Sequence, residues 1–600
     1  HDKDNNLWLI ANGKINTYNP VTGKDVNTEI DASAFEFDEH GVLWIGTIKG
    51  ELKTISIDKK KFKLQDVQLS DKPLLSAPVT KILPYKAYIL IGTRRGLFKY
   101  NVKTGELSTL LKRNADGTNV YIRDIKILTN GECWLATETG IFIYDLAANS
   151  YKNIKKRIGD QYSLSDNAVY TLFQDKREGV WAGTFFGGLN HFSTENNAFQ
   201  KYFPINTANS ISGNAVREIC GDEENNIWIG TEDAGINKFD PEKNTFCHFS
   251  NGKLPSDLSY PNIHGLMVNK DEVFAGPFLQ GLEILDRKTG KVVKRFPVIR
   301  HRESAIHAFI MSIAKTSSGK ILVGTTGAGL FYYEPQMKTL VSIPQIPQKS
   351  FVYAIAEDHT GTIWTGSLAN GAFFYNPKTG KYGNVSFKRK INPPPTEDQI
   401  QGIFEDSDNT LWFATEGGGL IKLSKDHKTF KRFDAKIGFP TNNIFRILED
   451  NGHNLWMSSL KGLICFNIKT EKFNVYSKSN GLLTDQFNYN SAYKDKDGKM
   501  YFGSVKGLIA FHPDSLKKKT PVPPLYITAI HISPNSDTEK ADASKKSITS
   551  YDSIALAHDQ STFDIEFAAL DYSAPDLIRY RYKLEGLNEQ WTQINSNRKA

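Results

Sequence analysis

A single stretch decides the fold: Asn226-Ile-Trp-Ile-Gly-Thr-Glu-Asp-Ala-Gly-Ile-Asn-Lys-Phe-Asp240. It predicts a strand at 227–231, a tight turn containing acidic residues and glycine, and a second strand at 235–239. The same pattern returns around Trp44, Trp134, Trp181 and Trp412. A pattern that recurs at a fixed spacing indicates a repeat architecture, so the chain is best analysed as copies of this stretch and what lies between them.

The tryptophan of the W-x-G-T motif, or the apolar residue in its place, marks each copy. Twelve such positions occur: Trp8, Trp44, Leu90, Trp134, Trp181, Trp228, Phe274, Leu322, Trp364, Trp412, Trp456 and Tyr501. Neighbouring positions are 36 to 48 residues apart, mostly in the mid-forties. This period is typical of a four-stranded propeller blade, and a closed ring usually has about four to eight blades. The sequence therefore predicts an all-β protein with two propellers.

Each repeat predicts four strands joined by turns. In the Trp228 copy the first strand is expected at 215–220 and the fourth at 245–249, with the acidic turn Asp222–Asn226 after the first strand. Asp and Asn side chains accept hydrogen bonds from nearby backbone amides, which favours turns. Because comparable acidic turns recur through the chain, we interpret them as structural rather than as ligand or catalytic sites.

The composition is that of a globular protein: 40% of the residues are hydrophobic, 23% are charged, and the formal net charge is +8. On a chain of 600 residues this excess of positive charge is small. It fits an ordinary solvated surface and favours an acidic ligand only slightly. No apolar run reaches the roughly 18 residues of a membrane span. Four cysteines lie in predicted strands without metal-ligand spacing, and we expect them to be small buried residues: Cys133, Cys220, Cys247 and Cys465. No cofactor or metal site is expected.

Three domains are expected. Residues 1–208 form a first propeller that lacks its opening blades, and residues 209–516 form a second, seven-bladed propeller. Residues 517–600 contain a lysine- and proline-rich linker and a truncated fibronectin-like β-sandwich. Because the chain starts inside one repeat and stops inside a strand-rich module, we expect it to be a fragment of a longer protein.

Two motifs carry a resemblance to a known family. The W-x-G-T…G-G-L repeat resembles the regulator-propeller repeat, and Tyr580-Arg-Tyr-Lys-Leu-Glu-Gly-Leu-Asn-Glu-Gln-Trp591 resembles the Y-Y-Y domain that follows such propellers. Together they resemble the periplasmic sensor region of the hybrid two-component system regulators of gut Bacteroidetes. The resemblance implies a periplasmic region of an inner-membrane protein that binds an oligosaccharide, signals through a C-terminal sandwich within a homodimer, and controls glycan-utilisation genes. Its kinase or DNA-binding output would lie outside this chain.

Ligand contacts are expected where the repeats vary. In a propeller, the start of each innermost strand faces the central channel. The residue after the first apolar position there is often large and polar: Arg123, Tyr170, Arg217, His264, Tyr353 and Gln401. A packed channel needs no Arg or His, so these residues are candidate ligand contacts. The alternative is that they fill a hydrated channel mouth.

Two further departures from the repeat add candidates. Phe278 stands in F-A-G-P-F, where other copies have an acidic turn. The following loop gathers Arg300, His301 and Arg302, and arginine recognises carboxylate or sulfate through paired hydrogen bonds. The Phe185–Phe186 pair suits either stacking on a sugar or contact between rings.

No catalytic motif is present: G-x-S-x-G, H-E-x-x-H and the P-loop are all absent. The basic residues are scattered, which argues against nucleic-acid binding. Two alternatives to a sensor remain open. One is a two-propeller glycoside hydrolase or polysaccharide lyase, because geometry rather than sequence decides whether two carboxylates form a catalytic pair. The other is a non-catalytic scaffold for a partner protein.

Overall fold

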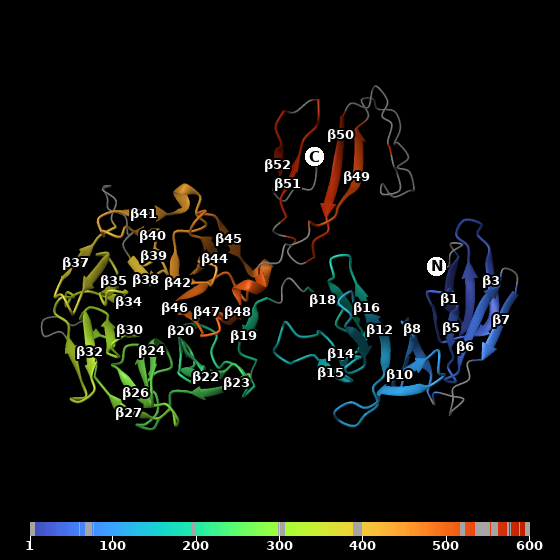
Figure 1. Ribbon diagram of the computed structural model, residues 1–600, viewed down its shortest axis with the longest axis horizontal. Coiled ribbons are helices and arrows are strands. Elements are labelled where there is room, and N and C mark those ends of the chain that lie inside the picture. Colours follow the sequence, from blue (N-terminus) through green and yellow to red (C-terminus); the bar gives the residue numbers. More distant parts are fainter. Residues whose placement is uncertain are drawn as a thin grey trace. The chain divides into compact units, whose positions relative to one another are not determined.

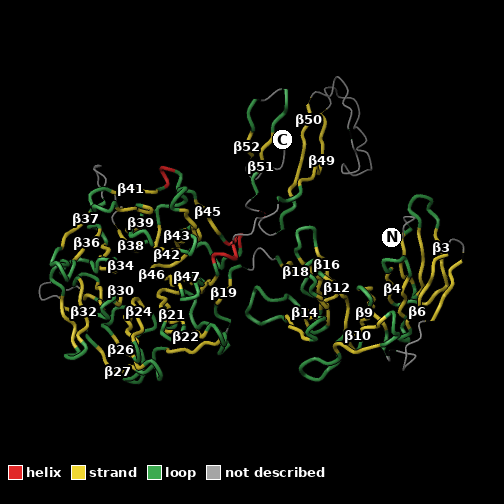
Figure 2. The backbone as a smooth tube through the Cα atoms, in the orientation of Figure 1, coloured by secondary structure: helices red, strands yellow, loops and turns green. Residues whose placement is uncertain are grey.

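The structure is a computed structural model in which His1–Thr194 and Glu195–Ala600 form two compact units. It describes residues 6–58, 61–66, 75, 77–193, 198–205, 207–297, 299–300, 307–387, 399–516, 522–533, 553, 562–572, 575, 578–586 and 589–594. The protein is all-β, as predicted (Figure 1). Figure 2 shows strands and loops throughout both units; the described helical segments are short 3-10 turns at Ala435–Ile437, Lys478–Asn480 and Pro513–Leu516.

The first unit contains five antiparallel sheets, each made of strands that follow one another in the chain. Their inner strands contact one another in the order β4, β8, β12, β16. The strands are β1 (Leu7–Ala11), β2 (Lys14–Tyr18), β3 (Asp25–Asp31); β4 (Ala34–Phe37), β5 (Leu43–Gly46), β6 (Leu52–Asp58), β7 (Lys61–Asp66); β8 (Val79–Tyr85), β9 (Tyr88–Thr93), β10 (Gly96–Asn101), β11 (Leu107–Leu111); β12 (Ile122–Ile127), β13 (Cys133–Thr137), β14 (Gly140–Asp145), β15 (Ser150–Ile154); β16 (Val169–Gln174), β17 (Val180–Thr184), β18 (Leu189–Phe192).

The second unit contains a ring of seven four-stranded sheets. Its inner strands contact in the order β20, β24, β30, β34, β38, β42, β46, and β46 contacts β20 again. The strands of the first six blades are β20 (Val216–Gly221), β21 (Ile227–Thr231), β22 (Ile236–Asp240), β23 (Thr245–Phe249); β24 (Ile263–Asn269), β25 (Glu272–Pro277), β26 (Glu283–Asp286), β27 (Val292–Arg295); β30 (Ile310–Lys315), β31 (Ile321–Thr325), β32 (Leu330–Glu334), β33 (Thr339–Ser342); β34 (Val352–Glu357), β35 (Ile363–Ser367), β36 (Ala372–Tyr375), β37 (Tyr382–Val385); β38 (Gln399–Glu405), β39 (Leu411–Glu416), β40 (Gly419–Leu423), β41 (Phe430–Phe433); β42 (Ile444–Glu449), β43 (Asn454–Ser459), β44 (Gly462–Asn467), β45 (Phe473–Tyr476).

The seventh blade joins the two ends of the ring. It combines β46 (Phe487–Lys494), β47 (Met500–Ser504) and β48 (Gly507–Phe511) with β19 (Gln200–Tyr202), a strand that precedes all the others in this ring. Lys201 pairs with Ile509 across the antiparallel ladder. Strand β19 lies before the expected domain boundary at 208/209, and its pairing places it in the second ring.

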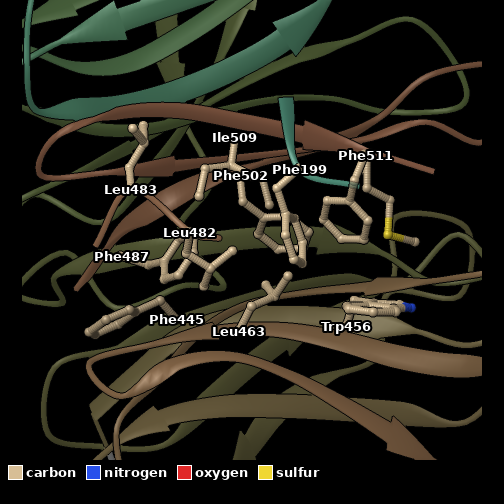
Figure 3. Close-up of a cluster of buried hydrophobic side chains, with 12 residues drawn as sticks. Phe199, Phe445, Trp456, Leu463, Leu482, Leu483, Phe487, Phe502, Ile509 and Phe511 are labelled. Atoms are coloured by element: carbon tan, nitrogen blue, oxygen red, sulfur yellow. The ribbon is translucent and has the colours of Figure 1, made fainter. Parts of the chain in front are cut away.

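A buried aromatic cluster holds this closure in place (Figure 3). Phe199, next to β19, lies edge-on to Phe511 of β48, with the ring centroids 5.1 Å apart. Trp456 of the neighbouring blade lies 4.9 Å from Phe511. Phe199 is 3% exposed, so its burial couples the first strand of the ring to the last two blades.

The acidic turns that follow six of the inner strands are structural, as interpreted from the sequence. Asp222 accepts hydrogen bonds from the backbone amides of Glu224 and Asn226 and from the indole nitrogen of Trp228, at 2.9 to 3.0 Å. The same aspartate-to-indole bond, 2.7 to 3.0 Å long, spans six residues in five other blades: Asp38–Trp44, Asp175–Trp181, Asp358–Trp364, Asp406–Trp412 and Asp450–Trp456. The turn thus fixes the tryptophan that packs between blades.

The other elements are small. A hairpin of β28 (Ile299–Arg300) and β29 (His307–Ala308) follows the second blade of the ring, and the C-terminal segment forms the pairs β49 (Leu525–Ser533) with β50 (Thr562–Ala569) and β51 (Tyr580–Tyr582) with β52 (Thr592–Ile594). Among the described residues, no helix is long and apolar enough to cross a membrane.

All four cysteines lie in strands and are free, as expected. Cys133 and Cys220 are buried and Cys465 is partly buried. The expectation of burial is wrong for Cys247, which is exposed because β23 is the outermost strand of its blade.

Candidate functional site

The six candidates on the inner strands share one backbone feature, a β-bulge at the start of the strand. In β20 the pairing with β21 shifts by one residue between Val216 and Glu218, so Arg217 is the extra residue. A bulge of this kind bends the strand and redirects a side chain. Equivalent shifts occur at Arg123, Tyr170, Tyr353 and Gln401, and a shift between Ile263 and Leu266 spans His264.

Within a blade, the bulge residue contacts the residue four positions after the repeat's anchor. The Arg217 guanidinium lies 3.4 Å from the Glu232 carboxylate, and the Gln401 amide donates to Glu416 at 2.9 Å. His264 stacks on Phe278, with ring centroids 4.7 Å apart and planes 22° apart. Each of these blades therefore presents a two-residue unit whose chemistry changes from blade to blade.

In the second ring, these units converge at one mouth of the central channel. The Arg217 guanidinium lies over the ring of Tyr489 from β46, 4.3 Å from its centroid. The Asn488 amide donates to Glu232 at 3.1 Å, which ties the last blade of the ring to the first. Arg217 is only 2% exposed, so its charge is held within the protein.

The second and third blades contribute an aromatic wall. Phe309, just before β30, packs edge-on against Phe278, with the centroids 4.9 Å apart. The His264 imidazole also lies 3.5 Å from the sulfur of Met311, the bulge residue of β30. Burial and the nearby Arg217 lower the pKa of His264 to about 3, so at neutral pH this ring is uncharged and serves as a hydrogen-bonding group.

Tyr353 and Gln401 continue the wall in the fourth and fifth blades. Burial raises the pKa of Tyr353, and Tyr489 and Glu416 add to the rise while the positive charge of Arg217 opposes it. Groups from three other blades therefore influence the Tyr353 hydroxyl, and the amide of Asn490 donates to the backbone oxygen of Tyr353. The candidates Arg217, His264, Phe278, Tyr353 and Gln401 therefore belong to one cluster.

The channel is filled beneath this cluster. Asn490, whose backbone is left-handed at φ 53°, donates from its amide to the backbone oxygens of Met311 and Tyr353 at 3.4 Å each. Burial raises the pKa of Glu218 well above its usual range, although Arg217 and Arg446 oppose this. A side chain from the last blade thus reaches the third and fourth blades, so a ligand would meet the mouth and not an open pore.

Arg123 and Tyr170 lie together in the first unit. The Arg123 guanidinium lies 4.2 Å from the Tyr170 ring centroid and pairs with Glu138. Tyr170 stacks on Phe185, which contacts the 87%-exposed ring of Phe186. The structure therefore gathers these residues into a cluster within the first unit.

Three candidates have no described side chain. The backbone of Arg300 pairs with that of His307 in the β28–β29 hairpin. His301 and Arg302 lie outside the described residues. Their role as ligand contacts stays a prediction.

Several residues of the mouth were missed from the sequence. Glu232 lies directly after β21 and Glu416 ends β39, within the repeated stretch that was interpreted as structural. The signal that could have found them is their position four residues after the tryptophan. Tyr489 and Asn488 lie in the irregular opening of β46, where the pairing with β47 shifts by several residues between Phe487 and Ala492. This segment departs from the repeat pattern, so only its extra residues relative to the other repeats could have indicated a role at the mouth.

Comparison with known proteins identifies the repeat. The two-component regulator propeller family matches residues 163–186, 210–233 and 395–417. These stretches contain the bulge residues Tyr170, Arg217 and Gln401 together with their partners at or just after the ends of the second strands. The chain therefore carries two-component regulator propeller repeats, and the resemblance expected from the W-x-G-T motif is confirmed.

The whole chain also has a solved structural counterpart. The extracellular domain assigned to the hybrid two component system BT3049 from B. thetaiotaomicron superposes with a TM-score of 0.73, at 24% sequence identity, over 100% of this chain and 85% of that one. The two share a fold. Histidine kinase P4 from Formosa agariphila is 28% identical over 204 residues, which are 34% of this chain and 15% of that relative. The chain thus matches only a small part of the kinase.

Proposed function

We propose that this chain is the extracellular ligand-sensing region of a membrane-anchored two-component regulator and that it binds an oligosaccharide at the mouth of the second ring. Three findings support the proposal: the two-component regulator propeller repeats, the fold shared with the extracellular domain of a hybrid two component system, and the partial match to a histidine kinase.

The binding site is supported by a contrast between the recurring structural bonds of the blades and the variable residues at the mouth of the second ring. The Asp–Trp bond recurs from blade to blade, whereas the bulge residues differ and meet at one place. Buried amide and ionic groups beside aromatic faces are suited to sugars, because a sugar ring offers hydroxyl groups at its edge and apolar C–H groups on its faces. Identical repeats would need no such variety if their only task were to close a ring.

The charges at the mouth favour a neutral sugar. The Arg217 guanidinium faces Glu232, and Glu416 accepts hydrogen bonds from the amides of Gln399 and Gln401. With His264 uncharged, the charged groups of Arg217, Glu232 and Glu416 are already paired or hydrogen-bonded. This arrangement fits a neutral oligosaccharide better than the acidic one that the net charge slightly favoured.

Signalling requires more than binding. A ligand shifts a conformational equilibrium only through its different affinity for two states. We propose that these states differ in the C-terminal sandwich of a homodimer anchored in the inner membrane, and that the output controls glycan-utilisation genes. Sedimentation of the 600-residue chain with and without ligand tests the dimer; a monomer under both conditions would contradict it.

The binding site is tested with a panel of neutral and acidic oligosaccharides in isothermal titration calorimetry. Arg217→Gln and Gln401→Ala each remove a hydrogen-bonding group from the mouth, and we expect affinity to fall by about 10- to 100-fold, as for lost bonds to charged or buried groups. Arg287→Gln is the matched control, because Arg287 of the second ring pairs with Glu224 away from the mouth. Unchanged affinity in both mouth variants, with thermal melting intact, would reject this site.

The same mixtures of protein and oligosaccharide also distinguish a sensor from an enzyme and from a scaffold. Binding with no change in the glycan supports a sensor. Shortened or unsaturated products seen by chromatography would support the hydrolase or lyase alternative, and no binding to any member of the panel would favour a scaffold.

A further inference from the structure

A groove of about 800 Å³ lies in the first unit, between two adjacent blades. One side is formed by the β8–β9 hairpin, with Tyr85, Lys86 and Tyr88, and by Lys99 of β10. The other side is formed by the turns before β13 and after β14 and by the start of β15. These turns lie at the end of the inner strands opposite to the bulges, so the groove and the Arg123–Tyr170 cluster are separate sites.

The walls of the groove are held in one conformation by local hydrogen bonds. Asp145 accepts from the backbone amides of Ala147 and Ala148 at 2.9 Å each. Tyr144 donates to the backbone oxygen of Leu110 at 3.0 Å and stacks on Tyr151, with an interplanar angle of 15°. Tyr151 is 45% exposed and offers its ring to the groove. The volume lies within the roughly 300 to 1,000 Å³ typical of small-ligand sites, and the site is largely preformed.

The charges of the groove differ from those of the mouth in the second ring. Its two carboxylates are engaged: Glu132 accepts from the Trp134 indole at 2.9 Å, and Asp145 caps its turn. Three ammonium groups remain, those of Lys86, Lys99 and Lys152, and among the described residues none of them forms an ion pair with a carboxylate. The Lys99 ammonium lies over the ring of Tyr88, 4.9 Å from its centroid.

We propose that this groove is a second binding site, for an oligosaccharide that carries sulfate or carboxylate groups. The lysines supply unpaired positive charge for the anionic groups, and the tyrosine rings supply flat faces for the sugars. The proposal stands independently of the mouth in the second ring, which has paired charges and suits a neutral ligand.

The probe is sulfated cellotetraose, with unsulfated cellotetraose and inorganic sulfate as comparisons, titrated into the 600-residue chain at physiological salt. We expect saturable binding of the sulfated probe to be weakened at least about tenfold by the double substitution Lys99→Gln/Lys152→Gln, because it removes two ammonium groups that would contact the sulfate groups. Tyr151→Ala should also weaken binding of the sulfated probe, because it removes an aromatic ring from the wall of the groove without changing its charge.

The matched control is Lys112→Gln, an exposed lysine at the opposite end of one of the same two blades. Equal weakening by this control would mean non-specific attraction and would overturn the proposal. Unchanged affinity in the double variant, or displacement of the probe by inorganic sulfate at an equal sulfate concentration, would also overturn it. Arg217→Gln should leave this binding unchanged, so failure here and failure of the second-ring site are distinguishable.

Discussion

In six blades, the aspartate directly after the inner strand accepts a hydrogen bond from that blade's tryptophan. Asp222 is buried, yet hydrogen bonds from Trp228 and Asn226 outweigh the effect of burial and hold its pKa below the usual range. Glu232, only ten residues later, instead points to the channel mouth and faces Arg217. Two acidic residues in one repeat therefore have separate tasks, one in the frame and one at the candidate site.

Trp228→Phe should destabilise the second ring by about 1–3 kcal/mol, because the buried Asp222 carboxylate loses a hydrogen-bond donor. Urea unfolding followed by circular dichroism measures this loss. Tyr382→Phe, on an exposed outer strand, is the control and should change stability very little. An equal effect of both substitutions would show that the indole bond contributes nothing.

His264 should remain uncharged from pH 8 to pH 5. Its folded pKa of about 3 lies below its unfolded value, so its contribution to stability is complete above the unfolded pKa and is lost as the pH falls toward 3. The His264→Gln variant should therefore lose less melting temperature than the native chain between pH 7 and pH 4. An imidazole resonance of His264 that titrates near pH 6.5 would contradict this prediction.

At the scale of elements, β19 is the strand that makes the second ring continuous. It pairs with β48 through three residues, and Phe199 beside it enters the cluster formed with Trp456 and Phe511 (Figure 3). Three residues of ladder contribute little by themselves. The closure therefore rests on the burial of Phe199, on the packing of Tyr202 of β19 against Phe239, and on the contact of β46 with β20.

Phe199→Ala should cost about 3–5 kcal/mol, as for other buried phenylalanines, and should loosen the seventh blade first. Hydrogen–deuterium exchange measures the effect as faster exchange in β19 and β48 than in β34, on the far side of the ring. Phe430→Ala, on the outer strand of another blade, is the control because this residue is 39% exposed. Equally fast exchange in all strands of the ring would contradict a local effect at the pairing of β19 with β48.

Much of this arrangement could be predicted from the sequence. The W-x-G-T spacing predicted the blades, because every repeat has the same packing pattern. The variable position on the inner strand predicted the candidates Arg217, His264 and Gln401. Strand β19 could not be predicted, since Gln200–Tyr202 is short and its partner lies about 300 residues away in the chain. The groove with Lys99 and Tyr151 was also missed, because its walls come from turns of two separate repeats.

At the scale of the whole molecule, the two units carry candidate sites of different chemistry. The mouth of the second ring is built from paired ionic groups, amides and aromatic rings, whereas the lysines of the groove in the first unit form no ion pair with a carboxylate among the described residues. A chain with two such sites could respond to a neutral and an anionic part of one glycan, or to two glycans.

A neutral oligosaccharide that binds the second ring should therefore protect only part of the chain. We expect slower hydrogen–deuterium exchange at the starts of β20, β24, β34 and β38 and no change in β8, β9 or β14. The sulfated probe should give the reverse pattern. Protection of both regions by each ligand would contradict two separate sites.

The pairing of β19 with β48 also sets the order of events during synthesis. The closing strand leaves the ribosome about 300 residues before its partner, so six blades must be made while β19 has no hydrogen-bonded neighbouring strand. Contacts between such distant residues form slowly, and an unpaired strand is open to wrong partners in the meantime. The last step in maturation of this ring is thus the pairing of β19, which is synthesised first, with β48, which is synthesised last. A chain that stops short of residue 507 would lack the partner that its first strand needs.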